Sequence, residues 1–145
     1  MKNKYTLITG ASSGIGLEIA SCMAKKGHNL ILTARRENIL MEASKSISEK
    51  CKVKVDYIAA DLSDVDAPEI IFNYCEEKDY EIDILVNNAG YGIPTSFHKT
   101  SMEEEENFIR VLAISVIRSS CLAFSRSISM SPPGSTNAHF LVSSQ

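Results

Sequence analysis

The sequence lacks the features that mark several specialised classes of protein. Its four cysteines form no Cys-x-x-Cys pair and its first residues form no signal-peptide pattern, so we expect free thiols in a cytoplasmic protein. No apolar run approaches the roughly 18 residues that cross a membrane, and the three histidines have no metal-ligand spacing. With 15 Lys and Arg against 18 Asp and Glu, and no basic stripe, we expect no nucleic-acid partner.

The composition fits one globular domain with one core. The chain has 145 residues, of which 44% are hydrophobic and 23% charged, with a formal net charge of −3, which excludes disordered and collagen-like classes. Short apolar runs predict strands at residues 5–9, 29–33, 53–58, 82–86 and 139–143. Helical spacing of apolar residues predicts helices at 14–27, 39–50, 67–78 and 101–129. This alternation predicts an α/β fold, a doubly wound parallel sheet covered on both faces.

The last of these helices has a clear start signal. Ser101 and Glu104 have the Ser-x-x-Glu spacing of a capping box, and residues 103–106 form an acidic first turn. Carboxylates near a helix N-terminus oppose the positive end of the helix dipole, so we assign this run of charge no binding role.

A glycine-rich turn lies between the first predicted strand and the first predicted helix. Its sequence is Thr9-Gly10-Ala11-Ser12-Ser13-Gly14-Ile15-Gly16. At this place backbone amides and the positive helix end can hold a pyrophosphate. Gly10 permits a sharp exit from the strand, Gly14 lets the backbone approach phosphates, and Gly16 allows close packing of the helix. A purely structural glycine turn is the alternative.

The sequence resembles the short-chain dehydrogenase/reductase family, whose nucleotide loop reads Thr-Gly-x-x-x-Gly-x-Gly. Later motifs follow the third, fourth and fifth strands in the family's order: Asp61-Leu62, Asn87-Asn88-Ala89-Gly90 and Ser143-Ser144. In a doubly wound sheet these places lie at the carboxyl edge, where ligands bind. The resemblance implies a Rossmann fold, with residues 1–145 forming a nucleotide-binding domain truncated after the fifth strand. It also implies hydride transfer between a nicotinamide cofactor and a small-molecule carbonyl or alcohol substrate.

The second predicted strand is followed by two arginines rather than an acidic residue. An acidic residue about 20 positions after the glycine turn binds the ribose of NAD, whereas Arg35 and Arg36 suit the 2′-phosphate of NADP. We therefore expect NADP(H) rather than NAD(H), with Arg35 as the stronger candidate. Some family members that prefer NADP(H) carry a basic residue where this chain has Ser13. Two solvated arginines at a helix entrance are the alternative.

The motifs after the third and fourth strands supply the other candidate cofactor ligands. By resemblance, Asp61 accepts a hydrogen bond from the adenine amino group and Leu62 lies beside the ring. A turn or N-cap aspartate is an equally good interpretation of Asp61. Asn87, Ala89 and Gly90 resemble the strand-end motif that supports the cofactor ribose and stabilises the sheet.

Ser144 is the candidate catalytic residue. The resemblance implies that it hydrogen-bonds the substrate carbonyl or hydroxyl, and a turn-forming serine is the alternative. In the family a tyrosine exchanges the proton and a lysine four residues later lowers its pKa. This Tyr-x-x-x-Lys motif is expected roughly a dozen residues after the serine, and the sequence has none after Ser144. We therefore expect the chain to be inactive alone.

The sequence also contains one misleading match to the family pattern and one further departure from it. Tyr74 and Lys78 match Tyr-x-x-x-Lys literally, but they precede the Asn-Asn-Ala-Gly motif, on a helix predicted to pack on the sheet. We reject a catalytic role for them and interpret them as part of a charged helix face. Where the family often has an asparagine for proton relay, this chain has Leu112, whose side chain cannot hold a water.

Two hypotheses about function follow. The first is the N-terminal portion of an NADP(H)-dependent oxidoreductase that acts on a carbonyl/alcohol pair. The alternative is a non-catalytic NADP(H)-binding or regulatory module.

Because a fifth strand without further elements leaves an edge and apolar surface exposed, we expect the chain to associate. We expect a homo-oligomer for the full-length protein.

Overall fold

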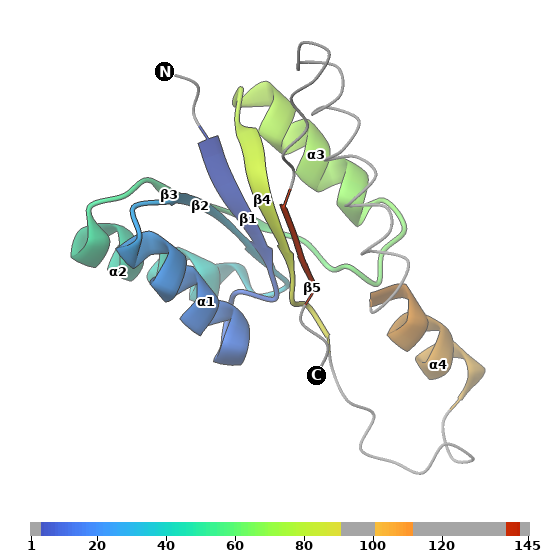
Figure 1. The fold of residues 1–145 in the computed structure, drawn as a ribbon. Coiled ribbons are helices and arrows are strands. Elements are labelled where there is room, and N and C mark those ends of the chain that lie inside the picture. The colour runs from blue at the N-terminus through green and yellow to red at the C-terminus, as the bar shows by residue number, and fades with distance from the viewer. Residues whose placement is uncertain (1–3, 91–100, 112–138, 143–145) are drawn as a thin grey trace.

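Parallel strands form the centre of the structure. The computed structural model describes residues 4–90 and 101–111, and the backbone of residues 139–142. The described strands are β1 (Lys4–Thr9), β2 (Asn29–Ala34), β3 (Val55–Ala59), β4 (Glu81–Asn87) and β5 (His139–Val142). They pair in the order β3-β2-β1-β4-β5, and each pairing is parallel (Figure 1). The doubly wound parallel sheet predicted from the sequence is confirmed.

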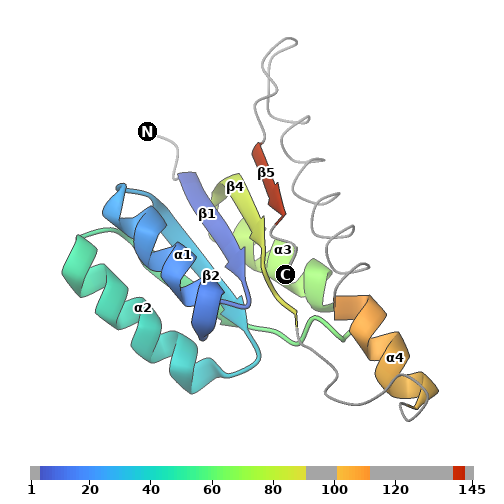
Figure 2. The same ribbon diagram turned by 60° about the horizontal axis from the view of Figure 1, so that its bottom comes forward.

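Helices cover both faces of this sheet. The described helices are α1 (Gly14–Lys25), α2 (Glu37–Cys51), α3 (Ala67–Glu77) and α4 (Met102–Ile109). In both views α1 and α2 lie on one face and α3 on the other (Figures 1 and 2). This division follows from right-handed crossovers, because the strand order runs one way from β1 to β3 and the other way from β1 to β5.

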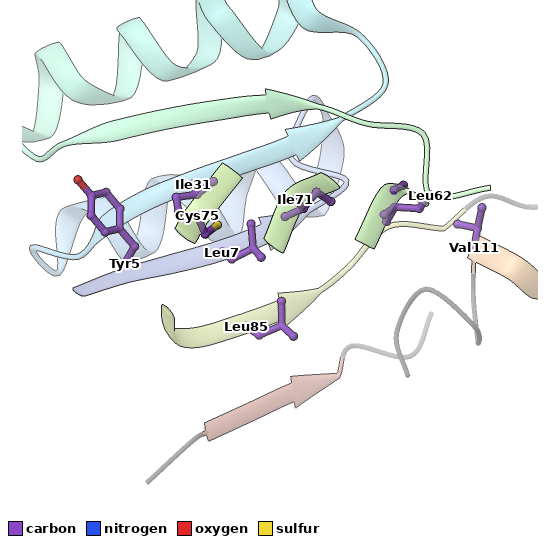
Figure 3. Packing of buried hydrophobic residues seen from close by; sticks show 9 residues of the cluster. Tyr5, Leu7, Ile31, Leu62, Ile71, Cys75, Leu85 and Val111 are labelled. Carbon is purple, nitrogen blue, oxygen red and sulfur yellow. The ribbon is translucent and has the colours of Figure 1, made fainter. Parts of the chain in front are cut away.

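Alternating side chains of the strands divide the core into two clusters. On β1, Tyr5 and Leu7 point toward α3, whereas Ile8 points toward α1 and α2. The α3-side core contains Tyr5, Leu7, Ile31, Leu62, Ala67, Ile71, Cys75, Leu85 and Val111 (Figure 3). The α1/α2-side core contains Ile8, Ala11, Ala20, Ala24, Leu30, Leu32, Leu40, Ile47 and Val86. The central strands are therefore buried on both faces, as their uninterrupted apolar runs require.

Helix α4 begins at the predicted capping box. The Ser101 hydroxyl accepts a hydrogen bond from the Glu104 amide at 3.2 Å, and the Glu104 carboxylate accepts one from the Ser101 amide at 2.8 Å. The continuation of the predicted helix to residue 129 lies largely outside the described residues.

The start of β3 differs from the sequence prediction by two residues. Lys52 ends α2 in the left-handed conformation, with a φ of 59°, and the Val53 carbonyl accepts a hydrogen bond from the Ser48 hydroxyl at 2.8 Å. Residues 52 and 53 therefore belong to the turn between α2 and β3, although Val53 suits a strand. Such a local competition between turn and strand is invisible to an apolar pattern.

The same described residues contain no helix that is both long and apolar enough to cross a membrane. They also contain no group of three or more His, Cys, Asp or Glu side chains arranged to hold a metal ion.

Candidate cofactor site

The glycine turn after β1 is shaped by contacts that exclude side chains. Gly10 has a φ of +66°, and a Cβ built on it would lie 2.8 Å from the Ala89 Cα. A Cβ on Gly16 would collide with the Gly10 carbonyl and the Asn88 side-chain amide. Gly16 thus allows α1 to approach both its own entry turn and the segment that follows β4.

Asn88 and Thr9 hold these two segments together. The Thr9 hydroxyl accepts hydrogen bonds from the backbone amides of Asn88 and Ala89, each at 3.0 Å. The Asn88 side-chain amide donates to the carbonyls of Thr9 and Gly10 at 3.2 and 3.4 Å. Sequence reasoning did not select Asn88 as a site residue, although its motif was recognised. Only the pairing of β1 with β4 brings its amide to the glycine turn.

The N-terminus of α1 opens at the carboxyl edge of the sheet. Its N-cap residue Ser13 makes no side-chain cap, and its first turn carries no acidic residue. The helix therefore does not neutralise its own positive end with its side chains. An anion at this turn would find backbone donors and a favourable dipole.

A pocket of about 300 Å³ lies beside the glycine turn. Most predicted cofactor residues line it: Gly10, Ser12, Ser13, Arg35, Arg36, Asp61, Leu62, Ala89 and Gly90. Four predicted residues do not line it: Gly14, Ile15, Gly16 and Asn87. Of these, Gly14 and Ile15 border a separate apolar groove along α1, and Asn87 is buried at the end of β4. The carboxyl ends of β1, β2, β3 and β4 thus contribute to one pocket.

The two arginines form one rim of the pocket. Arg36, the N-cap residue of α2, donates a hydrogen bond from Nη2 to the Ser12 hydroxyl at 3.5 Å. Arg35 also lines the pocket, and its guanidinium has no hydrogen bond or ion pair to any described residue. Arg36 thus links the end of β2 to the glycine turn, while Arg35 leaves its donors available to a ligand.

Asp61 shapes the turn after β3. One carboxylate oxygen, Oδ1, accepts hydrogen bonds from the Ser63 amide at 3.0 Å and the Ser63 hydroxyl at 2.8 Å. The turn interpretation of Asp61 is therefore confirmed. Because both bonds use Oδ1, the geometry leaves the second oxygen, Oδ2, for a ligand, so the two interpretations of Asp61 are compatible.

Helix α4 supplies a wall of the pocket that the sequence did not predict. Asn107 lies on α4 and Val111 lies two residues beyond its last residue, and both line the pocket. Ala34, Ala60 and Ser63 are further lining residues outside the predicted set. The i, i+4 spacing of Asn107 and Val111 was visible in the sequence, but no pattern showed which side of α4 faces the pocket.

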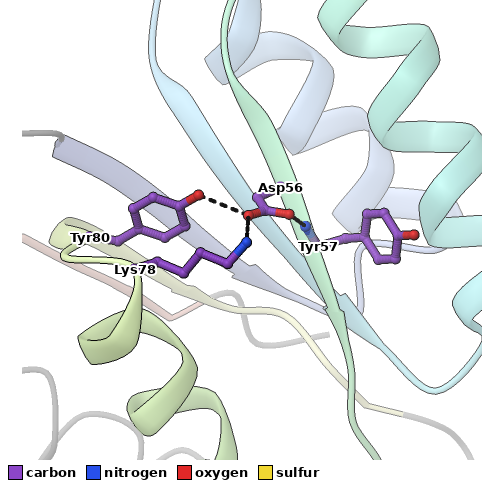
Figure 4. Close-up of polar contacts among 4 residues, drawn as sticks. All are labelled: Asp56, Tyr57, Lys78 and Tyr80. Atoms are coloured by element: carbon purple, nitrogen blue, oxygen red, sulfur yellow. Dashed lines mark hydrogen bonds and ion pairs between the residues drawn. The ribbon is translucent and has the colours of Figure 1, made fainter.

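Tyr74 and Lys78 lie away from the pocket, near Asp56 at the amino end of β3. The Asp56 carboxylate accepts a hydrogen bond from the Tyr80 hydroxyl at 2.8 Å and pairs with Lys78 at 3.5 Å (Figure 4). Burial alone would raise the pKa of Asp56, but hydrogen bonds from Tyr80, the Tyr57 amide and Tyr74, with the Lys78 charge, hold that pKa below its ordinary value.

This arrangement explains the Tyr-x-x-x-Lys match as a structural one. Burial, followed by the hydrogen bond to Asp56, raises the pKa of Tyr80, so its hydroxyl stays a donor. The Tyr80 ring also packs against the tilted ring of Tyr5 on β1, with ring centroids 4.2 Å apart. The interpretation as a solvated charged helix face was incomplete, because Lys78 pairs with the strand carboxylate of Asp56. Ser144 and Leu112 lie outside the described residues.

Known proteins share this sequence and this arrangement. The family model for short chain dehydrogenase matches residues 4–132. A very-long-chain 3-oxoacyl-CoA reductase of Kluyveromyces lactis is 38% identical over 116 residues, which are 76% of this chain and 32% of that protein.

Solved structures of dehydrogenases and reductases share the fold of this chain. A short-chain dehydrogenase of Sphingobium yanoikuyae in complex with NADPH superimposes with a TM-score of 0.80 and 31% identity, over 87% of this chain and 49% of the other. The L-sorbose reductase of Gluconobacter frateurii, complexed with NADPH and L-sorbose, gives 0.77 and 30%, over 88% and 51%.

The fold and the site define a doubly wound protein with its pocket at the carboxyl edge of the sheet, which is the nucleotide-binding class. The chain belongs to the short-chain dehydrogenase family of oxidoreductases. It spans about a third of the length of the 3-oxoacyl-CoA reductases that it matches, and about half of the solved structures.

Proposed function

We propose that residues 1–145 form the NADP(H)-binding domain of an oxidoreductase that interconverts a carbonyl and an alcohol. The observation that carries this proposal is the single pocket that gathers the glycine turn, Arg35, Arg36 and Asp61. A dinucleotide offers a diphosphate, a phosphorylated ribose and a purine, and the pocket offers a complementary group for each. Relatives named for NADPH complexes and for reductase activity support the same assignment.

The residues present fit such a cofactor. The uncapped start of α1 and the glycine turn suit the diphosphate, because the backbone amides and the positive end of the helix favour an anion there. Arg35 suits the 2′-phosphate, because guanidinium pairs bidentately with phosphate oxygens. Arg36 would reinforce that site through the Ser12 hydroxyl that it already contacts.

The remaining predicted ligands act on the adenosine and at the sheet end. We assign Asp61 and Leu62 to the adenine, and Ala89 and Gly90 to the cofactor ribose. Asn87, which is buried at the end of β4, is assigned a supporting role at this strand end. Ser144 is assigned to the substrate carbonyl or hydroxyl.

When bound, the nicotinamide supplies or accepts the hydride. The residues of this chain bind the dinucleotide, orient it along the carboxyl edge and, at Ser144, hold the substrate oxygen. Proton transfer at that oxygen needs a further acid, since Tyr74 and Lys78 surround Asp56 of β3 rather than lining the pocket. We therefore propose that these 145 residues bind NADP(H) without efficient turnover.

A non-catalytic NADP(H)-binding module is the second candidate function. The observation that favours it is that the binding groups are together in the described residues, whereas a tyrosine–lysine pair is not found among those lining the pocket. Both functions require the same pocket, so binding tests them jointly and turnover separates them.

Direct titration tests the proposal. Reduced nicotinamide is excited at longer wavelengths than aromatic side chains, so the fluorescence of bound NADPH or NADH can be followed directly. We expect NADPH to bind more tightly than NADH by at least about tenfold. Equal affinities, or tighter NADH binding, would contradict the NADP(H) assignment. Rapid oxidation of NADPH with ketones and aldehydes by the 145-residue protein would contradict the need for a further acid.

A further inference from the structure

Asn107 on α4 is a polar residue that lines the pocket. Neither the sequence motifs nor the proposed function assigns it a role. It lines the pocket together with Asp61 and Leu62, which come from the turn after β3. The described residues offer its side-chain amide no hydrogen-bond partner. An amide that faces a pocket without a partner is available to a ligand.

The surroundings of Asn107 suit a flat apolar ring with a polar edge. Leu62 and Val111 are 8% and 7% exposed, and both belong to the α3-side core. With Ala60 they give this end of the pocket apolar surface, while Asp61 and Asn107 add polar groups. The arginines occupy the rim near β2 and the glycine turn. A purine therefore fits the α4 end of the pocket, and a phosphate fits the arginine end.

Helix α4 holds Asn107 in place through contacts at both of its ends. The capping box of Ser101 and Glu104 fixes the first turn, and an ion pair joins Glu106 in the last turn to the C-cap residue Arg110. Val111, two residues beyond the end of α4, packs in the α3-side core and anchors the chain that follows the helix. Asn107 is thus presented from a fixed helix, which favours a specific contact over an adaptable one.

We infer that Asn107 reads the edge of the adenine ring, an inference that rests on the proposed nucleotide function. Its amide oxygen accepts a hydrogen bond from the N6 amino group, and its amide nitrogen donates one to N7. This is the bidentate pairing that asparagine makes with adenine in nucleic-acid recognition. Asp61 complements Asn107. Its carboxylate can accept a hydrogen bond from the N6 amino group, but it cannot donate one to N7. Asn107 is therefore a specificity-determining residue for adenine over other purines.

Binding of two dinucleotides to the 145-residue protein tests this role. The probes are NADPH and its hypoxanthine analogue, in which a carbonyl oxygen replaces the amino group, so that the Asn107 amide faces two acceptors. We expect Asn107→Ala to weaken NADPH binding by about 5- to 10-fold and to change binding of the hypoxanthine analogue by less than about twofold. The preference for adenine falls accordingly. Asn107→Asp, which keeps the size and loses the donor, should also weaken NADPH binding.

A matched control is Glu103→Ala, one turn earlier on the same side of α4, exposed and outside the pocket lining. It should leave both affinities unchanged, and circular dichroism should show the same helical content for all variants. If Asn107→Ala weakens both probes equally, or neither, the adenine contact is overturned while the nucleotide pocket stands. If the unmodified chain binds neither probe, the proposed function fails and this inference fails with it.

Discussion

The Thr9 hydroxyl accepts hydrogen bonds from the backbone amides of both Asn88 and Ala89. Thr9 ends β1 and Asn88 follows β4, so one buried oxygen joins the ends of two paired strands directly beneath the glycine turn. The shape of the pocket therefore depends on a side chain that does not line it.

Replacement of Thr9 by valine should lower the free energy of unfolding by about 1–3 kcal/mol, because two partly buried amides lose their acceptor while the side-chain shape is kept. NADPH binding should weaken as well. Urea unfolding measures the first effect and cofactor fluorescence the second. The control is Thr6→Val on the same strand, since the Thr6 hydroxyl is buried without a partner in the described residues. A loss of stability in Thr6→Val as large as in Thr9→Val would contradict this explanation.

Gly16→Ala should lower both stability and nucleotide affinity. Its Cβ would collide with the Gly10 carbonyl and the Asn88 amide, and relief of that overlap costs about 1–3 kcal/mol. The comparison variant is Gly27→Ala, where φ is +88° and a Cβ would meet open space, so only backbone strain of about 1–2 kcal/mol is expected. Thermal unfolding should report destabilisation in both variants. Unchanged NADPH binding in Gly16→Ala would show that the glycine turn does not shape the pocket.

The arginines should differ in their effect on cofactor choice. Arg35→Ala should weaken NADPH binding by tenfold or more and leave NADH binding almost unchanged, because only NADPH carries the 2′-phosphate. Arg36→Ala should have a smaller effect, since Arg36 already donates to Ser12. Lys45→Ala on the exposed side of α2 removes the same charge away from the pocket. Equal losses of NADPH affinity in Arg35→Ala and Lys45→Ala would show that the effect comes from net charge and not from a contact of Arg35 with the 2′-phosphate.

Asp56 should make stability depend on acid pH. Its folded-state pKa lies below the ordinary 3.8, so its contribution to stability is fully present above that value and is lost as the pH falls through the lower, folded-state pKa. Asp56→Asn should therefore reduce stability at neutral pH and flatten its decline in acid. Unfolding by urea at a series of pH values measures this, with Asp83→Asn of the exposed Lys4–Asp83 pair as the control. An unchanged acid slope in Asp56→Asn would contradict the assigned hydrogen bonds.

The sequence predicted the elements, the sheet and most of the pocket, because each of these follows from local patterns. Apolar runs predicted the strands, and the glycine spacing and the turn at Asp61 predicted candidate ligand groups after successive strands. The hydrogen bonds of Asn88 to the glycine turn depend on the pairing of β1 with β4. The position of Asn107 at the pocket depends on how α4 packs beside the sheet. Tyr80 and Asp56 are 24 residues apart, and nothing in their local sequence indicates that they meet.

Because every described strand pairs in parallel, all strands begin on one side of the sheet and end on the other. The Asp56–Tyr80 contacts lie near the amino ends of the strands, and the pocket lies at their carboxyl ends. The cluster around Asp56 and the aromatic pair of Tyr5 and Tyr80 secure one edge, and the glycine turn occupies the other. Changes that raise thermal tolerance can therefore be sought at the tyrosine edge while cofactor preference is redesigned at the arginine rim. Substitutions made at the two edges should have additive effects, as is usual for sites without shared partners.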